Sequence, residues 1–334
     1  MTIYDISEKA GVSIATVSRV LNGSDRVSEK TKRKVLDIIE QYGYTPNAFA
    51  RGLGLNTMKT IGLLCADSSD IYMAKAIYFL ERLLRSKGYN SILCCSGYEL
   101  PDMEKSMQLL LSKKVDSIIL IGSTYIFEKE EDNAYIAEAA KHIPIMLLNG
   151  TLNIPNVYGV LSNDFTSVYE ATMYLLNAGT TDLLFFYNTL SYSTRNKMAG
   201  FCAAMEEKQL LKPHCLQQFH GSQEDIPGMV NHLQDLKNQG IPFNGIMACN
   251  DMLALGAVKY ANETGCKIPD DLSIIGYNNS MLANVSEPPL TSIDNRPETL
   301  CEYLINTLMD VLENKEASAK TVFSTELVKR RTTK

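Results

Sequence analysis

The chain has 334 residues, of which 45% are hydrophobic and 21% are charged, and its formal net charge is −6. This length allows two or three domains with separate cores, and the composition is that of a soluble globular protein. No apolar run approaches the ~20 residues of a membrane span, and the N-terminus lacks a signal pattern, so we expect a cytoplasmic protein with no membrane partner.

The charge is distributed unevenly along the chain. Residues 1–60 contain nine Lys and Arg against six Asp and Glu, whereas the remaining residues contain 23 against 32. A small basic segment joined to an acidic body is typical of a protein that presents one face to phosphates.

The first 23 residues predict two short helices joined by a tight turn. Thr2 is a plausible cap for the first helix, Gly11 suits the left-handed conformation that ends it, and Ser13 can cap the second. Such a corner is a helix-turn-helix, whose second helix enters a DNA major groove, although similar corners occur in ordinary helical bundles. The outward positions of the second helix are Ile14, Ala15, Thr16, Ser18 and Arg19.

A third helix is predicted from Ser28 to about Tyr42. Its apolar stripe would close a three-helix head, and consists of Val35, Ile38, Ile39 and Tyr42.

Residues 47–53 predict one or two further helical turns, capped by Asn47. Gly52 and Gly54 each destabilise so short a helix by roughly 0.5–1 kcal/mol, so it needs a partner to form. The segment is either a plain linker or a hinge that becomes helical when two copies pair on DNA.

From residue 61 onward, apolar runs alternate with helical stretches. This alternation predicts parallel sheets covered on both faces, and about ten strands are more than one such sheet holds comfortably, so we expect two lobes. The predicted strands are 61–66, 91–96, 116–122, 144–149, 157–162, 183–188, 245–250 and 272–278, and the helices include 74–87, 102–113, 165–178, 198–207 and 252–263.

Polar residues follow nearly every predicted strand. Ligands of open α/β sheets bind beyond the carboxyl ends of the strands, so these side chains suit a small polyhydroxy or heterocyclic ligand held between two lobes. Taken singly, each has a local explanation, since Asn, Asp and Ser also cap helices and start turns. They include Asp67, Asp70, Ser123, Asn149, Asp164, Asn188, Asn250 and Asn278.

No motif of a catalytic, cofactor or metal site is present. The four histidines pair with no acid or nucleophile and are expected to be ordinary surface residues, and the eight scattered cysteines form no CxxC pair. We therefore expect no enzyme, no cofactor and no metal, and we expect most cysteines to be small buried hydrophobes.

The head segments TIYDISEKAGVSIATVSRVLNG and VSEKTKRKVLDIIEQYGYTPNAFARGL resemble the lactose/galactose repressor (LacI/GalR) family, as do VDSIILIG, CNDMLALGAV and IPDDLSIIGYNN in the body. Within the family, the head is similar to the catabolite control protein A subgroup. The resemblance implies an all-α helix-turn-helix head and an α/β, two-lobed, periplasmic-binding-protein-like core of parallel sheets with Rossmann-like lobes. It also implies a homodimeric regulator, more often a repressor, that binds palindromic double-stranded operator DNA.

Residue by residue, the resemblance makes Ile14 and Ala15 the base-reading pair and Arg19 a base contact. Leu53 would wedge into the minor groove at the operator's centre. Phosphates or the helix corner would be held by Tyr4, Ser13, Thr16, Ser18 and Asn22, with Asn47 beginning the hinge.

The core departs from the family pattern where an effector would bind. Lys197 stands at the usual arginine position with Arg195 nearby, Asn278 replaces an acid, and Asp70-Ile71-Tyr72 replaces Asn-Pro-Phe. These departures favour a phosphorylated or carboxylated ligand whose acceptors face Lys197, Arg195 and Asn278, and we expect a small effector of the sugar or sugar-phosphate class. The expected effector contacts are Asp67, Asp70, Tyr72, Asn149, Asp164, Arg195, Lys197, Asn250 and Asn278.

The expected domains are a head (1–45), a hinge (46–58), a first core lobe (59–162 plus 292–322) and a second lobe (163–291 plus 323–334). An alternative reading is a catabolite-control-type regulator whose core is switched by a partner protein. A third is a soluble sugar-binding protein or enzyme with an idle head.

Overall fold

The computed structural model describes residues 1–21, 23–44 and 57–334, and it divides into two compact units. One unit is Met1–Thr60 with Lys114–Asp116, and the other is Ile61–Lys113 with Ser117–Lys334. The Asp116 carboxylate connects residues 57–60 to the loop that contains Asp116. It accepts hydrogen bonds from Thr57 Oγ1 (2.9 Å) and from the Met58 and Thr60 N–H groups (2.9 and 3.1 Å).

The head consists of three helices, α1 (Ile3–Ala10), α2 (Ile14–Leu21) and α3 (Glu29–Gln41). A capping box starts α1: Thr2 Oγ1 accepts from the Asp5 N–H, and the Asp5 carboxylate accepts from the Thr2 N–H at 2.7 Å. Gly11 ends α1 with φ 60°, as expected.

The core of the head is small and apolar. Tyr42 was expected in its stripe but is 43% exposed, because it lies one position past the end of α3, where its ring receives the Lys9 ammonium at 4.5 Å. The fully or nearly buried residues are Ile6, Ala10, Val17, Val20 and Val35.

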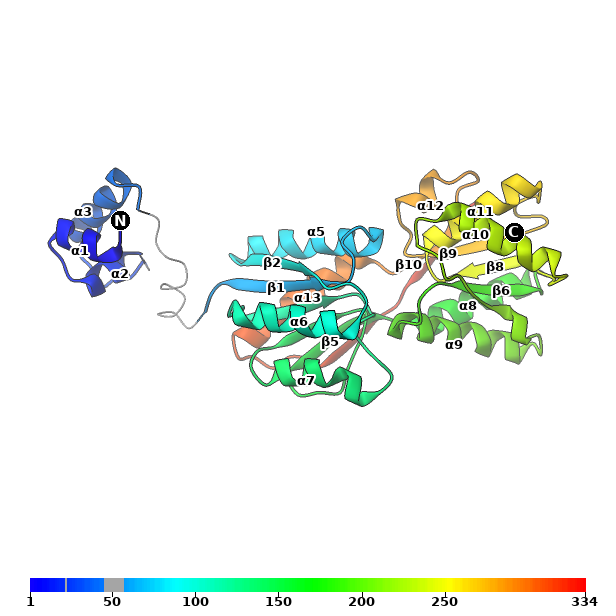
Figure 1. Cartoon of the computed structure of the whole chain (residues 1–334), viewed down its shortest axis with the longest axis horizontal. Coiled ribbons are helices and arrows are strands. Elements are labelled where there is room, and N and C mark those ends of the chain that lie inside the picture. Colours follow the sequence, from blue (N-terminus) through cyan, green and yellow to red (C-terminus); the bar gives the residue numbers. More distant parts are fainter. Residues whose placement is uncertain (22, 45–56) are drawn as a thin grey trace. The chain divides into compact units, whose positions relative to one another are not determined.

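The larger unit contains two six-stranded sheets, which we call the first and second lobes with their covering helices (Figure 1). The first sheet has the order β11-β5-β4-β3-β1-β2, and the second has the order β12-β10-β9-β8-β6-β7. The first-lobe strands are β1 (Thr60–Cys65), β2 (Asn90–Cys95), β3 (Ser117–Ile121), β4 (Ile145–Leu148), β5 (Val157–Ser162) and β11 (Lys320–Phe323). The second-lobe strands are β6 (Leu183–Tyr187), β7 (Leu216–Gln218), β8 (Gly245–Ala248), β9 (Ser273–Tyr277), β10 (Thr291–Asp294) and β12 (Glu326–Val328).

Parallel pairing in register explains the continuous apolar runs of the sequence. Leu63 pairs with Ile119 in the first sheet, Ile246 pairs with Ile274 in the second, and all four side chains are buried. The short β12 pairs antiparallel with β10 at one edge of the second sheet.

Helices cover both faces of each sheet. On the first sheet, α5 (Ile71–Ser86) packs with α13 (Pro297–Leu312) on one face, and α6 (Leu100–Ser112) and α7 (Ala134–Ala140) lie on the other (Figure 1). On the second, α8 (Asp164–Asn177) packs with α9 (Tyr192–Glu207), and α10 (Ile226–Asn238) with α11 (Asp251–Thr264), beside the short α12 (Met281–Val285). Two 3₁₀ turns, Glu130–Asn133 and Pro213–Cys215, complete the described elements.

The chain passes between the lobes three times. It leaves the first sheet after Ser162, returns after Asp294 through α13, and crosses again between Phe323 and Glu326.

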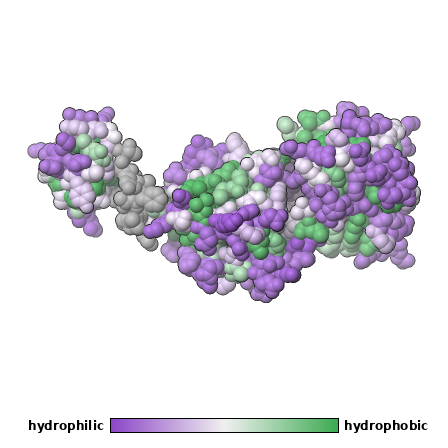
Figure 2. Space-filling model, viewed as in Figure 1, coloured by the Kyte–Doolittle hydropathy of each residue, from purple (hydrophilic) through white to green (hydrophobic). Residues whose placement is uncertain are grey.

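The side of the molecule seen in Figure 2 is largely hydrophilic, with hydrophobic side chains over α12, where Met281 and Val285 are 72% and 66% exposed.

Candidate nucleic-acid interface and interlobe cleft

The outer face of α2 carries the side chains predicted to meet DNA. Ile14 is 38% exposed, Ala15 and Arg19 are exposed, and Thr16 and Ser18 are partly exposed. The opposite face, with Val17 and Val20, is buried in the head core. Ser13 Oγ accepts from the Thr16 N–H at 3.2 Å and so begins the helix. The result is a narrow, small-residue face ending in a guanidinium, which fits a major groove.

Tyr4 lies on α1 and is 67% exposed, so its phenol is free to reach a phosphate from the head surface. The three remaining predicted DNA contacts, Asn22, Asn47 and Leu53, lie outside the described residues.

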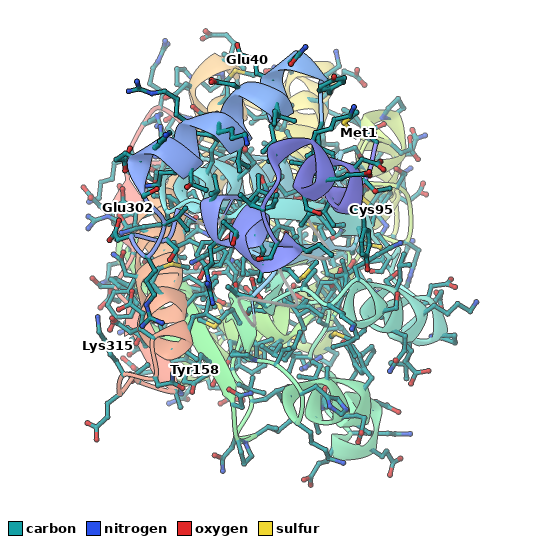
Figure 3. All side chains as sticks on the ribbon, turned by 90° about the vertical axis from the view of Figure 1, so that its left-hand side faces the viewer. Met1, Glu40, Cys95, Tyr158, Glu302 and Lys315 are labelled. Atoms are coloured by element: carbon teal, nitrogen blue, oxygen red, sulfur yellow. The ribbon has the colours of Figure 1, made fainter. Side chains whose placement is uncertain are left out.

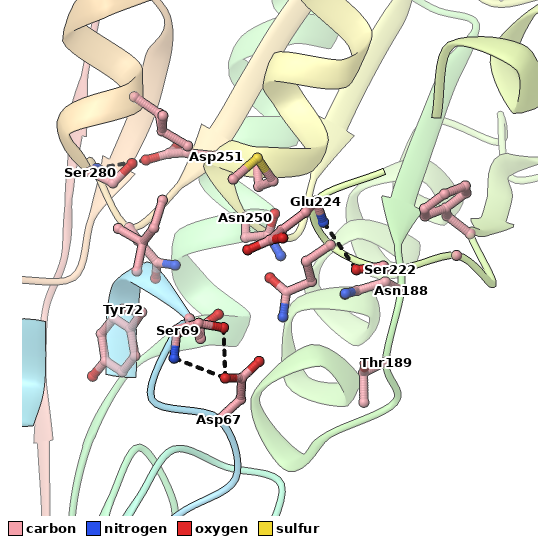
Figure 4. A pocket seen from close by; sticks show the side chains of 18 of the residues that line it. Asp67, Ser69, Tyr72, Asn188, Thr189, Ser222, Glu224, Asn250, Asp251 and Ser280 are labelled. Atoms are coloured by element: carbon pink, nitrogen blue, oxygen red, sulfur yellow. Dashed lines mark hydrogen bonds between the residues drawn. The ribbon is translucent and has the colours of Figure 1, made fainter. Parts of the chain in front are cut away.

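A cavity of about 620 Å³ lies between the lobes at the carboxyl ends of their strands (Figure 4). The first lobe contributes the segment after β1 and Tyr98, and the second contributes the segments after β6, β7, β8 and β9. Its lining includes Asp67, Ser69, Asp70, Tyr72, Asn188, Thr189, Phe219, His220, Gln223, Glu224, Asn250, Asp251, Asn278 and Ser280.

A smaller cavity of about 110 Å³ shares part of this lining. It adds Thr124 and Asn149 from the first lobe and Lys197 from α9. Asn149 donates to the Tyr72 hydroxyl at 2.6 Å, whereas Asn149 Oδ1 and Thr124 Oγ1 are buried without a hydrogen-bond partner. Buried polar atoms are rarely left unpaired, so these two are positioned to bond a ligand.

Seven of the nine predicted effector contacts line one or both cavities. The sheet topology brings them together, because strand ends far apart in the sequence meet at one edge of each lobe. They are Asp67, Asp70, Tyr72, Asn149, Lys197, Asn250 and Asn278.

Lys197 is held more tightly than a surface lysine. Its side chain is buried, its ammonium donates to the Cys249 carbonyl at 3.0 Å, and it lies 3.5 Å from the centroid of the Tyr277 ring. Because the ammonium group already makes these two contacts, Lys197 has fewer N–H groups to donate to a ligand than its position in the sequence suggests.

Asp164 lines neither cavity, contrary to expectation. It is the first residue of α8 and turns inward, where its carboxylate accepts from Ser193 Oγ (2.6 Å) and from the Tyr277 hydroxyl. Burial raises its pKa, against the opposing effect of Lys197 and these hydrogen bonds. Asp164 therefore binds the hydroxyl group of Tyr277, whose ring contacts the Lys197 ammonium.

Arg195 is also absent from the lining of both cavities. Its guanidinium donates to the carbonyls of Leu190 (2.8 Å) and Ile126 (3.2 Å) and pairs with Glu128 (3.3 Å). Because Ile126 and Glu128 belong to the first lobe, Arg195 joins the two lobes beside the cleft.

The sequence did not predict the cavity wall formed by the segment after β7. Phe219, His220, Ser222, Gln223 and Glu224 all face the large cavity, and Figure 4 shows Glu224 and Ser222 joined by a hydrogen bond there. This segment follows a short edge strand without an apolar run, so it gave no strand-end signal. Of the histidines expected at the surface, His220 is exposed and lines the cavity. His232, on α10, is only partly exposed and stacks on the Phe186 ring of β6, with 5.6 Å between the ring centroids.

The large cavity is acidic. Asp67, Asp70, Glu224 and Asp251 line it, and Lys197 of the small cavity is the one Lys or Arg in the lining that the structure describes for either cavity. Burial raises the pKa values of Asp70 and Asp251, because it disfavours their charged forms. Arg195 is engaged elsewhere, so among the described lining residues Lys197 is the one Lys or Arg that could meet a phosphorylated or carboxylated ligand. The expectation of such a ligand stays a prediction.

Within the described ranges, no helix has the length and apolarity to span a membrane, and no three ligand-type side chains gather as a metal site requires.

Comparison with known proteins covers both parts of the chain. Residues 2–47 match the family model for bacterial regulatory proteins of the lacI family, and residues 172–333 match the periplasmic binding protein-like domain. An HTH-type transcriptional regulator of Lachnoclostridium phytofermentans is 49% identical over 334 residues, which cover 100% of this chain and 99% of the relative. The transcriptional repressor PurR of Mannheimia succiniciproducens is 32% identical, with 100% and 98% covered.

Solved structures share the fold. The lac repressor dimer bound to operator and the anti-inducer ONPF aligns with a TM-score of 0.86 at 22% identity, covering 100% of this chain and 99% of that one. The transcription regulator CcpA of Lactococcus lactis aligns with a TM-score of 0.72 at 21% identity, covering 82% and 99%.

Proposed function

This chain belongs to the lacI family of bacterial regulatory proteins and is a DNA-binding transcriptional regulator, and we propose that a small ligand in its interlobe cleft controls its DNA affinity. The exposed face of α2 supports DNA binding, because it combines small side chains with Arg19 on a helix whose opposite face is buried. The acidic cleft between the lobes supports control by a small ligand.

We propose that two copies of the chain bind a palindromic operator, each placing one α2 in the major groove. Arg19 forks onto a guanine, Ile14 and Ala15 lie against base edges, and a cluster of polar side chains positions the head on phosphates. That cluster comprises Tyr4, Ser13, Thr16 and Ser18, with Asn22 and Asn47 assigned from the sequence alone. Leu53 is likewise assigned from the sequence alone, as the wedge at the operator's centre.

The proposed ligand is an uncharged, hydroxyl-rich metabolite. Carboxylates and amide oxygens accept from its hydroxyl groups, and the aromatic rings of Tyr72, Tyr98 and Phe219 suit the apolar faces of a sugar or heterocycle. Lys197, Asn149 and Thr124 would hold the part that enters the small cavity. Binding that brings the lobes closer would shift the relative position of the two hinges in a dimer.

The division into head (1–45), hinge (46–58) and two lobes (59–162 with 292–322, and 163–291 with 323–334) remains part of this proposal, as do action in the cytoplasm and the absence of catalysis. Switching by a partner protein remains the alternative, and no contact among the described residues favours it.

Selection of bound sequences from a random DNA pool, with and without a library of neutral sugars, tests the proposal. We expect a palindromic consensus whose enrichment changes with one or a few library members. Binding without sequence preference would contradict base reading by α2, and an unchanged consensus and affinity throughout would contradict the ligand switch.

A further inference from the structure

Two free thiols meet where β1 and β2 end. Cys65 closes β1 and Cys95 closes β2, and their sulfur atoms are 3.6 Å apart. The Ser96 N–H donates to the Cys65 carbonyl at 2.9 Å, which sets the two cysteines side by side on neighbouring parallel strands. Neighbouring strands lie about 4.8 Å apart, within the roughly 4.4–6.8 Å between Cα atoms that a disulfide spans. A bond between these sulfurs therefore requires only a small approach of the two strand ends.

The two thiols differ in exposure. Cys95 is exposed on the edge strand β2 and is labelled in Figure 3, whereas Cys65 is fully buried among apolar side chains. Burial, helped by the hydrogen bond with Cys95, raises the pKa of the Cys65 thiol to about 12. An oxidant from solvent therefore meets Cys95 first, with a protonated Cys65 behind it.

We infer that Cys65 and Cys95 form an oxidative modification site, at which hydrogen peroxide closes a reversible disulfide beside the ligand cleft. The Cys95 thiolate attacks one peroxide oxygen, the O–O bond breaks, and the hydroxide released takes a proton to become water. The resulting Cys95 sulfenic acid is attacked by the Cys65 sulfur, its S–O bond breaks, and that hydroxide leaves as water with the Cys65 proton. Two thiols lose two electrons, and one peroxide becomes two waters.

The disulfide would act on the cleft through short lengths of backbone. Bond formation shortens the sulfur separation from 3.6 Å to about 2.05 Å, and so draws the ends of β1 and β2 together. Asp67 follows Cys65 by two residues and Tyr98 follows Cys95 by three, and both line the large cavity. Between them, Ser96 Oγ contacts the Tyr125 hydroxyl at 3.0 Å, so the movement reaches a buried side chain as well.

Peptide mapping of the full chain tests the inference. After treatment with stoichiometric hydrogen peroxide and thiol blocking, trypsin should release residues 60–75 and 88–105 as one linked species lacking two hydrogen atoms. Dithiothreitol should restore the separate peptides. The rate of linkage should rise with pH, because the Cys65 thiol is almost entirely protonated near neutrality.

Cys94 supplies a matched control, because it precedes Cys95 on the same strand and alternation turns it to the other sheet face. Cys94→Ser should retain the linked species, whereas Cys95→Ser should lose it. The inference is overturned if the linkage survives Cys95→Ser, if peptide 88–105 instead closes an internal Cys94–Cys95 bond, or if Cys95 proceeds to sulfinic acid while Cys65 stays reduced.

Discussion

Arg19 supplies the guanidinium on the exposed face of α2, and its neighbours there have no comparable hydrogen-bonding capacity. Arg19→Ala should weaken operator binding by roughly 1–3 kcal/mol and relax preference at one base pair per half-site. Fluorescence anisotropy on the selected operator and on single-base variants measures both effects. Arg85→Ala, which removes an exposed guanidinium from α5 in the core, is the matched control and should bind normally. Equal losses on operator and random DNA would assign Arg19 to phosphate contact alone.

The raised pKa of Asp164, which is buried beneath the cleft, can be tested through the pH dependence of stability. Because burial raises its pKa above the ordinary 3.8, the stability contributed by its protonated form is present at low pH and is lost as the pH rises through the folded-state pKa. Asp164→Asn cannot titrate. The unfolding free energy of wild type minus that of the variant should therefore fall as the pH rises from about 3.8, the ordinary pKa, toward the raised pKa of the folded state. Urea unfolding of both proteins across this range gives the difference, and a rise would show that Lys197 outweighs burial.

At the scale of elements, helices α8 and α9 depend on a glycine at their closest approach. A Cβ on Gly200 would lie 2.2 Å from the Phe165 carbonyl oxygen and 3.1 Å from the Tyr169 nitrogen, both backbone atoms. Gly200→Ala should therefore destabilise the core by about 1–3 kcal/mol, although Ala favours a helix more than Gly does.

The neighbouring Ala199, exposed on α9, provides the opposite change. Ala199→Gly should cost about 0.5–1 kcal/mol through helix propensity alone. Denaturant unfolding of both variants separates crowding from propensity, and a stabilised Gly200→Ala would contradict the close packing.

Most of the central strands and the helix-turn-helix were predictable because each leaves a local signal. Strands buried on both faces become uninterrupted apolar runs, and Thr2, Gly11 and Ser13 mark helix ends by their own chemistry. The edge strands β7, β11 and β12 were not predicted, because they are short and half exposed. The inner strand β10 was not predicted either, because three of its four residues are Thr, Ser and Asp and form no apolar run. Helix α10 has Pro227 and Gly228 in its first turn, which obscure its pattern, whereas α13 has clear helical spacing and is missing from the predicted elements.

Local sequence patterns predicted only those site residues that follow the ends of predicted strands. Asp67, Asn149 and Asn250 follow strands and reach the cavities. The directions in which Asp164 and Arg195 turn depend on partners in other elements, Tyr277 and Ile126, which no local pattern specifies.

At the scale of the whole molecule, the acidic cleft should select ligands by charge. Isothermal titration of neutral sugars against the same sugars carrying a phosphate should show binding only among the neutral compounds, because a phosphate dianion would face Asp67, Asp70 and Glu224 with Lys197 already engaged. Asn149→Ala should weaken binding of the neutral compound, because it removes the Oδ1 atom, a buried acceptor without a hydrogen-bond partner. Tight binding of a phosphorylated member alone would show that Lys197 dominates the site.

The chain's three passages between the lobes also affect how the protein is made. Strand β5 pairs with β11, and β10 pairs with β12, so residues 320–328 complete an edge of both sheets. Until Lys320 and the residues after it have been synthesised, β5 presents one unpaired edge to other nascent chains. We therefore expect a nascent chain that stops before residue 320 to aggregate more readily than one that has passed residue 328.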